Sequence, residues 1–62
     1  MNMEKVKAKT IKINGEKYKV EVYLGDSKDF YYSICPRNGA ASCGNTVEDA
    51  VENLKEFIER RL

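Results

Sequence analysis

The most regular pattern in the chain is the alternation of apolar and polar residues on both sides of Asn14-Gly15. Asn-Gly is the most typical sequence of a two-residue β-hairpin loop, because both loop residues must adopt positive φ angles. Such a loop pairs the flanking residues in this order: Ile13 with Glu16, Ile11 with Tyr18, and Lys9 with Val20. Residues on one face of the hairpin are then Ile11, Ile13, Tyr18, Val20 and Val22.

The start of the first strand departs from this pattern. Val6 and Ala8 are out of phase with the apolar residues that follow them. A β-bulge near Lys9 or Thr10 would return both side chains to the inner face. The alternative is that the beginning of the strand frays.

A third strand is indicated after residues 25–29, whose Gly, Asp and Ser are typical of a turn. Phe30, Tyr32 and Ile34 alternate with their neighbours, which predicts that these three side chains face the core. Residues 36–39 (Pro-Arg-Asn-Gly) end this strand, and the small residues 40–43 predict a short fourth strand.

The last segment predicts a helix from Thr46 to Leu62, in which the Thr46 hydroxyl accepts a hydrogen bond from the amide of Asp49. Its apolar stripe contains Val47, Ala50, Val51, Leu54, Phe57, Ile58 and Leu62. This order of elements predicts an α+β fold, an antiparallel three- to four-stranded sheet with one C-terminal amphipathic helix packed on one face. The side chains expected beneath the helix are Ile11, Val20, Val22, Tyr32 and Ile34.

A single helix covers only one face of a sheet, so the other face should stay open. We expect this open face to carry Tyr23 and Tyr31 among charged side chains. Exposed tyrosines are common on protein surfaces, but tyrosine is also enriched at protein interfaces. The candidate partner or dimer interface is Lys19, Glu21, Tyr23 and Tyr31. A chain this small has a marginal core, so we also expect a homodimer or larger assembly, with Lys19 and Glu21 forming cross-interface pairs.

Composition narrows the class of protein. The 62 residues fit one domain, and 42% hydrophobic residues with a net charge of +1 argue against disorder. No apolar run is long enough to span a bilayer, and no secretory or transit pattern opens the chain. A cytoplasmic protein without membrane contacts is therefore expected.

Candidate chemistry is sparse. The chain has no His, which removes the usual general base and the commonest metal ligand. Cys35 and Cys43 are too few for a structural zinc site, and we expect two free thiols. Cys43 precedes the predicted helix start, where a thiol pKa can fall, but a small packed thiol is the favoured interpretation. We therefore expect no enzyme, no metal and no cofactor.

The first 19 residues are basic, with six Lys against two Glu, whereas the remainder carries five Lys and Arg against eight Asp and Glu. Lysines beside Tyr23 and Tyr31 could bind nucleic acid through phosphates and base stacking. Lysines on outer strands also prevent edge-to-edge aggregation, and the shortage of Arg favours this second interpretation.

From Phe30 onward the chain resembles the HicB antitoxin domain, including its short stand-alone members. The resemblance covers the strand 30–35 with Pro36 at its end, the step from Gly39 to Gly44, and the helix start Thr46-x-Glu48-Asp49-Ala50-x-x-Asn53. The preceding strand, residues 19–24, fits the first strand of that family, and the amino-terminal hairpin is additional.

This resemblance implies a single non-catalytic HicB-like domain over residues 1–62 that sequesters a small RNA-cleaving toxin, a HicA-like protein, and often self-associates. One alternative is a small inhibitor or adaptor of another protein, such as a phage or viral inhibitor of a host nuclease. The other alternative is a nucleic-acid-binding module that uses the lysine-rich hairpin.

Overall fold

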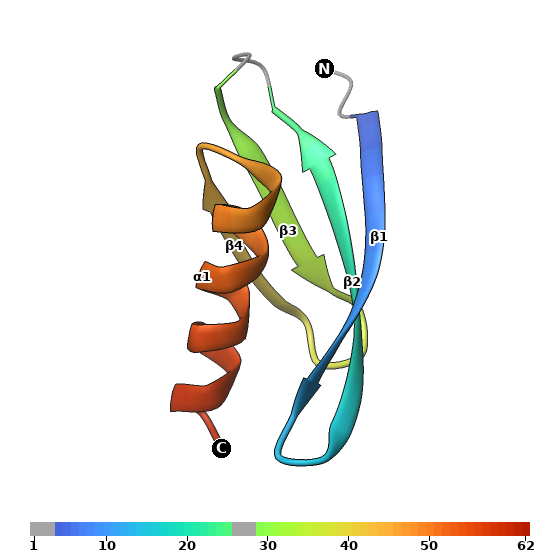
Figure 1. The fold of residues 1–62 in the computed structure, drawn as a ribbon, viewed down its shortest axis with the longest axis vertical. Coiled ribbons are helices and arrows are strands. Elements are labelled where there is room, and N and C mark those ends of the chain that lie inside the picture. Colours follow the sequence, from blue (N-terminus) through green and yellow to red (C-terminus); the bar gives the residue numbers. More distant parts are fainter. Residues whose placement is uncertain (1–3, 26–28) are drawn as a thin grey trace.

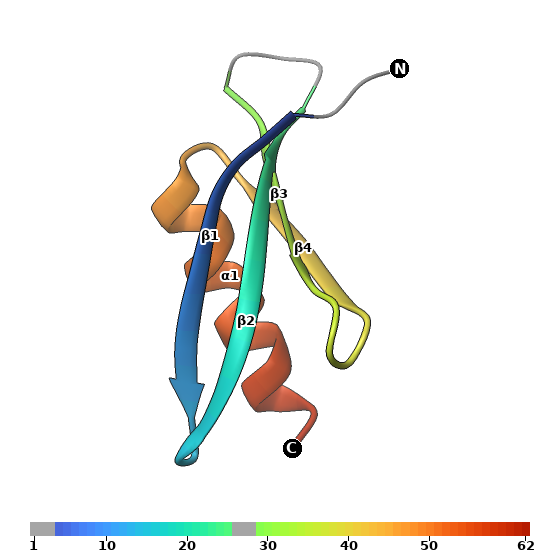
Figure 2. The ribbon, with the colours of Figure 1, turned by 90° about the vertical axis from the view of Figure 1, so that its right-hand side faces the viewer.

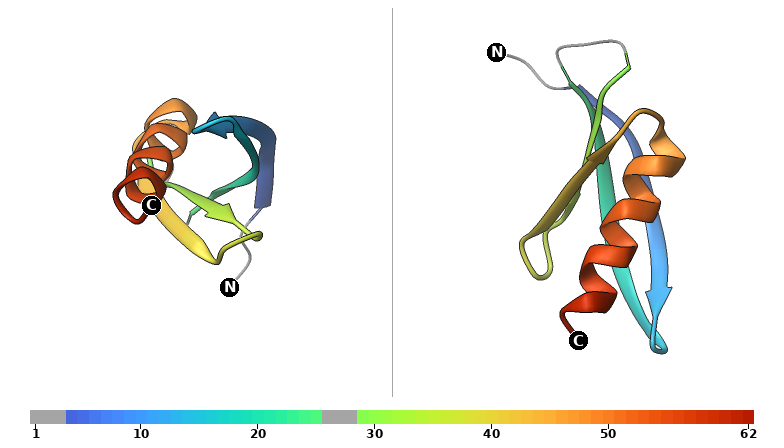
Figure 3. Two further views of the ribbon diagram at one scale, coloured as in Figure 1. Left: turned by 90° about the horizontal axis from the view of Figure 1, so that it is seen from below. Right: turned by 90° about the vertical axis from the view of Figure 1, so that its left-hand side faces the viewer.

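The computed structural model describes residues 4–25 and 29–62. It contains an antiparallel four-stranded sheet in the order β1-β2-β3-β4, followed by one helix. The strands are β1 (Glu4–Ile13), β2 (Glu16–Leu24), β3 (Tyr31–Cys35) and β4 (Ala40–Gly44), and the helix is α1 (Val47–Arg60). Helix α1 lies along one face of the sheet (Figures 1 and 2), and the strands curve around one side of it (Figure 3). The α+β fold predicted from the sequence is confirmed.

The amino-terminal hairpin has the predicted loop and register. Asn14 and Gly15 have φ angles of 51° and 82°, as a two-residue turn of this type requires. The three predicted pairs of opposite residues, from Ile13 with Glu16 to Lys9 with Val20, are all present. The large apolar side chains of the hairpin therefore lie on one face, where Ile13 and Val20 are almost fully buried.

The irregularity of β1 lies closer to the amino terminus than the sequence suggested. The register shifts between Lys5 and Lys7, not near Lys9 or Thr10. The shift does not return the small apolar side chains to the core, because Val6 remains 44% exposed and Ala8 pairs with Glu21 on the outer side. The prediction of an inward-facing Val6 and Ala8 is therefore wrong, and so is the alternative of a frayed strand start, because Glu4 and Lys5 pair with Leu24 and Tyr23.

Strand β3 has the opposite orientation to the one that its hydrophobic residues predict. Ser33 and Cys35 have no exposed surface and face α1, whereas Tyr32 points away from it. Tyr31, expected on the open face, instead packs against the buried core. The helix selects this orientation, because the Ser33 hydroxyl donates a hydrogen bond of 2.7 Å to the carbonyl of Ala50.

Small residues bring the helix close to the end of β4. A Cβ atom added to Gly44 would lie 2.6 Å from the backbone nitrogen of Ala50, a distance that real Cβ atoms do not adopt. Large side chains at the sheet positions beneath this part of α1 would therefore hold the helix away. This is the physical reason why Tyr32 and Ile34 lie on the other face.

Helix α1 begins as its sequence predicts. The Thr46 hydroxyl accepts a hydrogen bond of 3.0 Å from the amide of Asp49, and the helix ends at Arg60, two residues before the predicted end. The predicted apolar stripe is buried at its centre and exposed near its end, since Phe57 is 39% and Leu62 65% exposed. The buried helix residues are Ala50, Val51, Leu54 and Ile58.

Strands β2 and β3 separate before they reach the turn that follows β3 (Figure 2). Their pairing runs from Leu24 opposite Tyr31 to Glu21 opposite Ile34. The same register would place Val20 opposite Cys35 and then Lys19 opposite Pro36, and proline has no N–H to donate to a ladder. Pairing of β2 with β3 stops at Ile34, and Pro36 prevents it from resuming.

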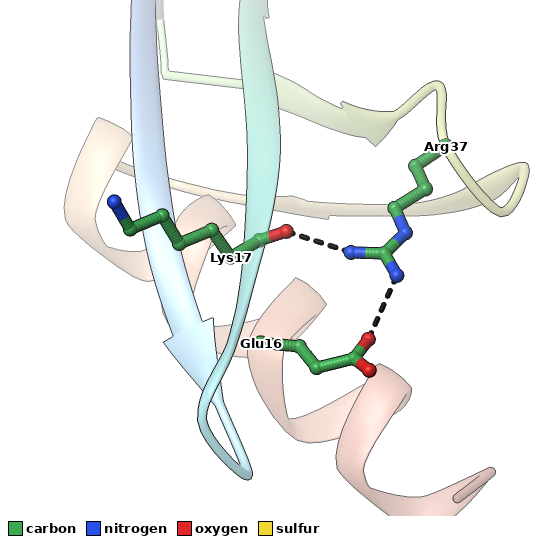
Figure 4. A network of polar contacts seen from close by, with 3 residues as sticks. All are labelled: Glu16, Lys17 and Arg37. Atoms are coloured by element: carbon green, nitrogen blue, oxygen red, sulfur yellow. Dashed lines mark hydrogen bonds and ion pairs between the residues drawn. The ribbon is translucent and has the colours of Figure 1, made fainter.

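Arg37, in the turn between β3 and β4, bridges the resulting separation (Figure 4). Its Nη1 donates to the carbonyl of Lys17 at 2.8 Å, and its Nη2 pairs with Glu16 Oε1 at 2.7 Å. The guanidinium also lies 4.7 Å from the centre of the Tyr18 ring. One side chain thus connects the hairpin to the β3–β4 turn where backbone pairing has stopped.

Candidate protein-interaction face

The sheet surface turned away from α1, here called the open face, carries a group of aromatic side chains. Tyr23 on β2 lies directly opposite Tyr32 on β3. The ring of Phe30 meets that of Tyr32 edge-to-face, with ring centres 4.7 Å apart and an interplanar angle of 80°. We call Tyr23, Phe30 and Tyr32 the aromatic cluster. Half-buried Ile34 continues it along β3.

Gly25 allows the aromatic cluster to form. Its amide donates a hydrogen bond of 2.8 Å to the carbonyl of Phe30, which joins the ends of β2 and β3. A Cβ atom at Gly25 would lie 2.9 Å from the Phe30 ring and 3.1 Å from the Tyr32 ring. The missing side chain therefore provides the space that the two rings occupy. Residues 26–28 of the predicted turn lie outside the described chain.

Polar contacts hold Tyr23 in place within the cluster. Its hydroxyl donates a hydrogen bond of 3.0 Å to Glu21 Oε1, and the other oxygen of Glu21 lies 3.6 Å from Lys5 Nζ. The hydrogen bond to the carboxylate, together with burial and the negative charge of Glu21, raises the pKa of Tyr23 above its usual value. Tyr23 therefore stays a neutral hydrogen-bond donor well above neutral pH.

The hairpin end of the open face is basic. Lys12 and Lys17 lie directly opposite each other, and Lys19 lies opposite Thr10. None of these three lysines forms an ion pair with a residue that the structure describes. Like charges at directly opposite positions destabilise a sheet slightly, so this arrangement does not serve the stability of the hairpin.

Strand β4 extends the open face to the edge of the sheet with small side chains. Ala41 and Cys43 are both exposed, opposite Ile34 and Tyr32 respectively. The carbonyl of Cys43 accepts a hydrogen bond of 2.8 Å from Asn53 Nδ2, so α1 satisfies one backbone group of this edge strand. The result is a surface of small, weakly polar side chains beside the aromatic cluster.

Three of the four predicted interface residues lie on the open face. Lys19, Glu21 and Tyr23 are there, whereas Tyr31 is on the helix side and Tyr32 takes its place. The predicted placement of Tyr31 on the open face is therefore wrong, and the interface role of the other three residues stays a prediction. The signal that would have identified Tyr32 is the series of small residues in phase with Tyr31, which marks the helix side: Ser33, Cys35, Ala40, Ser42 and Gly44.

The two cysteines lie on different sides of the sheet. Cys35 is buried beneath α1 and pairs with Ala40, whereas Cys43 is exposed and pairs with Tyr32. The hairpin formed by β3 and β4 therefore does not bring the two thiols opposite each other. Over residues 4–25 and 29–62, no group of three or more His, Cys, Asp or Glu side chains is placed to hold a metal ion.

Within the described part of the chain, no helix has the length and apolar character needed to cross a membrane. Comparison of the chain with protein-family models, with curated proteins and with solved structures found no match. The functional argument therefore starts from the geometry of the open face.

Proposed function

We propose that this protein is a non-catalytic binding domain of the HicB type, and that it holds a small protein partner on its open face. The observation that carries the proposal is the aromatic cluster on a sheet face that α1 leaves uncovered. Tyrosine and phenylalanine are enriched in the buried centres of protein interfaces, where they supply a large contact area. Tyr32 offers such area, since 37% of its surface is exposed.

The resemblance supports a particular class of partner. Residues 30–58 contain the strand, turn, short strand and capped helix in the order that the HicB domain has. The partner that this resemblance implies is a small RNA-cleaving toxin similar to HicA. In the proposed function, binding on the open face sequesters the toxin, and this chain supplies no catalytic group.

The open face also supports self-association in the absence of a partner. A second copy would cover the aromatic cluster by a twofold contact in which each copy presents the same surface. Sedimentation equilibrium at several protein concentrations tests this. We expect a dimer mass at high micromolar concentration and a shift toward monomer for Tyr32→Lys, whereas a mass near 7.1 kDa for the unaltered chain would contradict self-association.

The function itself is tested by capture followed by an activity assay. Tagged protein is used to capture its partner from the cells that encode it, and the partner is identified by mass spectrometry. We expect a small basic protein that cleaves RNA, and we expect cleavage to stop at a one-to-one ratio with this chain. A captured partner without RNA-cleaving activity would instead favour the alternative of an inhibitor or adaptor for another protein.

The unpaired lysines of the hairpin favour a second candidate function, the binding of single-stranded nucleic acid. Lys12, Lys17 and Lys19 are available to phosphates on the same face as the aromatic cluster. Binding of a labelled RNA oligonucleotide at several salt concentrations distinguishes the two functions. Nucleic-acid binding predicts an affinity that falls steeply with salt and falls further in Lys17→Gln.

A further inference from the structure

A cleft of about 460 Å³ lies on the helix side of the sheet, where β2 and β3 separate. The start of β2, the β3–β4 turn and the end of α1 form its walls. Its volume is in the range of sites that bind small ligands or single side chains of a partner. The residues that give it chemical character are Tyr18, Arg37, Ala40, Phe57, Ile58 and Arg61.

The cleft has one cation without an acidic partner. Arg37 already pairs with Glu16, but Arg61 forms no ion pair with a described residue. The Arg61 guanidinium instead lies 5.1 Å from the centre of the Phe57 ring. Such stacking fixes the position of a guanidinium while leaving its N–H groups free to donate, which suits the recognition of an anion.

A second observation points to a ligand. Tyr18 is only 6% exposed and lines the cleft, yet its hydroxyl has no hydrogen-bond partner in the described chain. None of the side-chain oxygens and nitrogens of the described residues is both enclosed and unpaired, so the Tyr18 hydroxyl reaches the open space of the cleft. An accessible hydroxyl with no partner in the protein is available to a ligand as a hydrogen-bond donor or acceptor.

The remaining wall is apolar. Ile58 is almost fully buried and Ala40 nearly so, whereas Phe57 keeps 39% of its surface exposed. An apolar group that packed against the exposed Phe57 ring would remove apolar surface from water, which favours binding. The cleft therefore combines a cation, an unpaired hydroxyl and an apolar wall within one small volume.

From this combination we infer that the cleft binds the carboxy-terminal residue of a peptide whose last side chain is apolar. The terminal carboxylate lies at the Arg61 guanidinium and accepts a hydrogen bond from the Tyr18 hydroxyl, and the side chain packs against Phe57 and Ile58. A terminal residue carries its carboxylate and its side chain on the same Cα atom, so both fit within one cleft. An internal acidic residue has no apolar group of its own. The apolar side chain would come from the next residue, which points to the opposite side of an extended chain.

This site is separate from the open face and does not depend on the proposed function. Tyr18 and Arg61 lie on the helix side, and none of the residues of the aromatic cluster lines the cleft. Loss of peptide binding would therefore leave partner binding on the open face intact, and the reverse also holds.

The test is a titration of isotope-labelled protein with synthetic pentapeptides, followed by two-dimensional NMR. The probe ends in Phe with a free carboxylate, and three controls end in Phe amide, in Gly with a free carboxylate, or carry Asp-Phe internally with an amidated end. We expect shifts in the amide signals of residues lining the cleft, and an affinity at least about tenfold lower for each control.

Two variants and one matched control locate the site. Arg61→Gln should weaken binding of the probe about tenfold, and Tyr18→Phe by a smaller factor, because a neutral hydrogen bond contributes less than a charged one. Arg60→Gln is the control, because Arg60 is the adjacent arginine, pairs with Glu56 at 3.8 Å and does not line the cleft. The inference is overturned if the amidated peptide binds as well as the probe, if Arg60→Gln weakens binding as much as Arg61→Gln, or if no cleft signals move at millimolar peptide.

Discussion

On the sheet face covered by α1, Val20, Val22 and Cys35 have no exposed surface, whereas on the open face Tyr32 keeps 37% of its surface exposed. The two faces are made by alternating residues of the same strands, so Tyr32 and its neighbour Ser33 differ completely in their surroundings. The covered face contains small side chains that let the helix approach closely. The open face contains the large rings, which contribute little to the core but offer a surface to a partner.

The largest expected effect is on the covered face, at the centre of the helix. Leu54 has no exposed surface, so Leu54→Ala removes buried methyl groups and leaves a cavity. We expect a loss of about 2–5 kcal/mol in the free energy of unfolding, measured by urea denaturation. A loss below about 0.5 kcal/mol would mean that this stripe of α1 does not face the core.

Alanine substitution of the two close-packed glycines compares the packing of the two faces directly. Gly44→Ala places a Cβ atom against helix backbone, 2.6 Å from the nitrogen of Ala50, so we expect a loss of about 1–3 kcal/mol. Gly25→Ala meets the Phe30 ring at 2.9 Å and the Phe30 carbonyl and Tyr32 ring at 3.1 Å, and because the closest atom belongs to a ring that can rotate, its loss should be smaller. Thermal or urea denaturation of both variants measures the difference. A larger loss for Gly25→Ala would contradict the rigid contact assigned to the covered face.

The alkylation rates of the two thiols distinguish the two faces. Cys43 is exposed and Cys35 is buried, so alkylation under native conditions should label Cys43 at least about tenfold faster. We predict that both are free, and labelling without reductant after unfolding should therefore modify two cysteines. Equal labelling rates for the native protein would show that α1 does not protect Cys35.

The smallest effect concerns the hydroxyl of Tyr23. Its hydrogen bond to Glu21 raises the pKa, so the folded state favours the protonated form. The stabilisation is complete below the usual tyrosine pKa of about 10 and disappears as the pH rises through the higher pKa of the folded state. In an ultraviolet titration, Glu21→Ala should lower the pKa of Tyr23, and an unchanged titration would contradict the contact.

Local signals in the sequence predicted most of the fold. Asn14-Gly15 determined the hairpin register because few residues tolerate the turn, and Thr46 with its following stripe determined the helix. The orientation of β3 was wrong because it depends on a non-local contact, the close packing of α1 on Ser33 and Gly44. Hydrophobicity alone assigns Tyr32 and Ile34 to the core, and this error placed Tyr31 instead of Tyr32 on the open face.

The cleft also could not be predicted from the sequence. It requires the separation of β2 from β3 after Ile34, and it brings together Tyr18, Arg37 and Arg61 from three distant segments. No spacing along the chain indicates that these three side chains are neighbours.

The central claim, that the open face holds the protein partner, is tested most directly by measuring the affinity of the captured partner for two matched variants. Tyr32→Lys and Glu52→Lys both introduce a lysine at an exposed position, the first on the open face and the second on α1. With folding verified by circular dichroism, we predict at least about a tenfold loss of affinity for Tyr32→Lys and no change for Glu52→Lys. Unchanged binding by Tyr32→Lys, or an equal loss in both variants, would contradict the account.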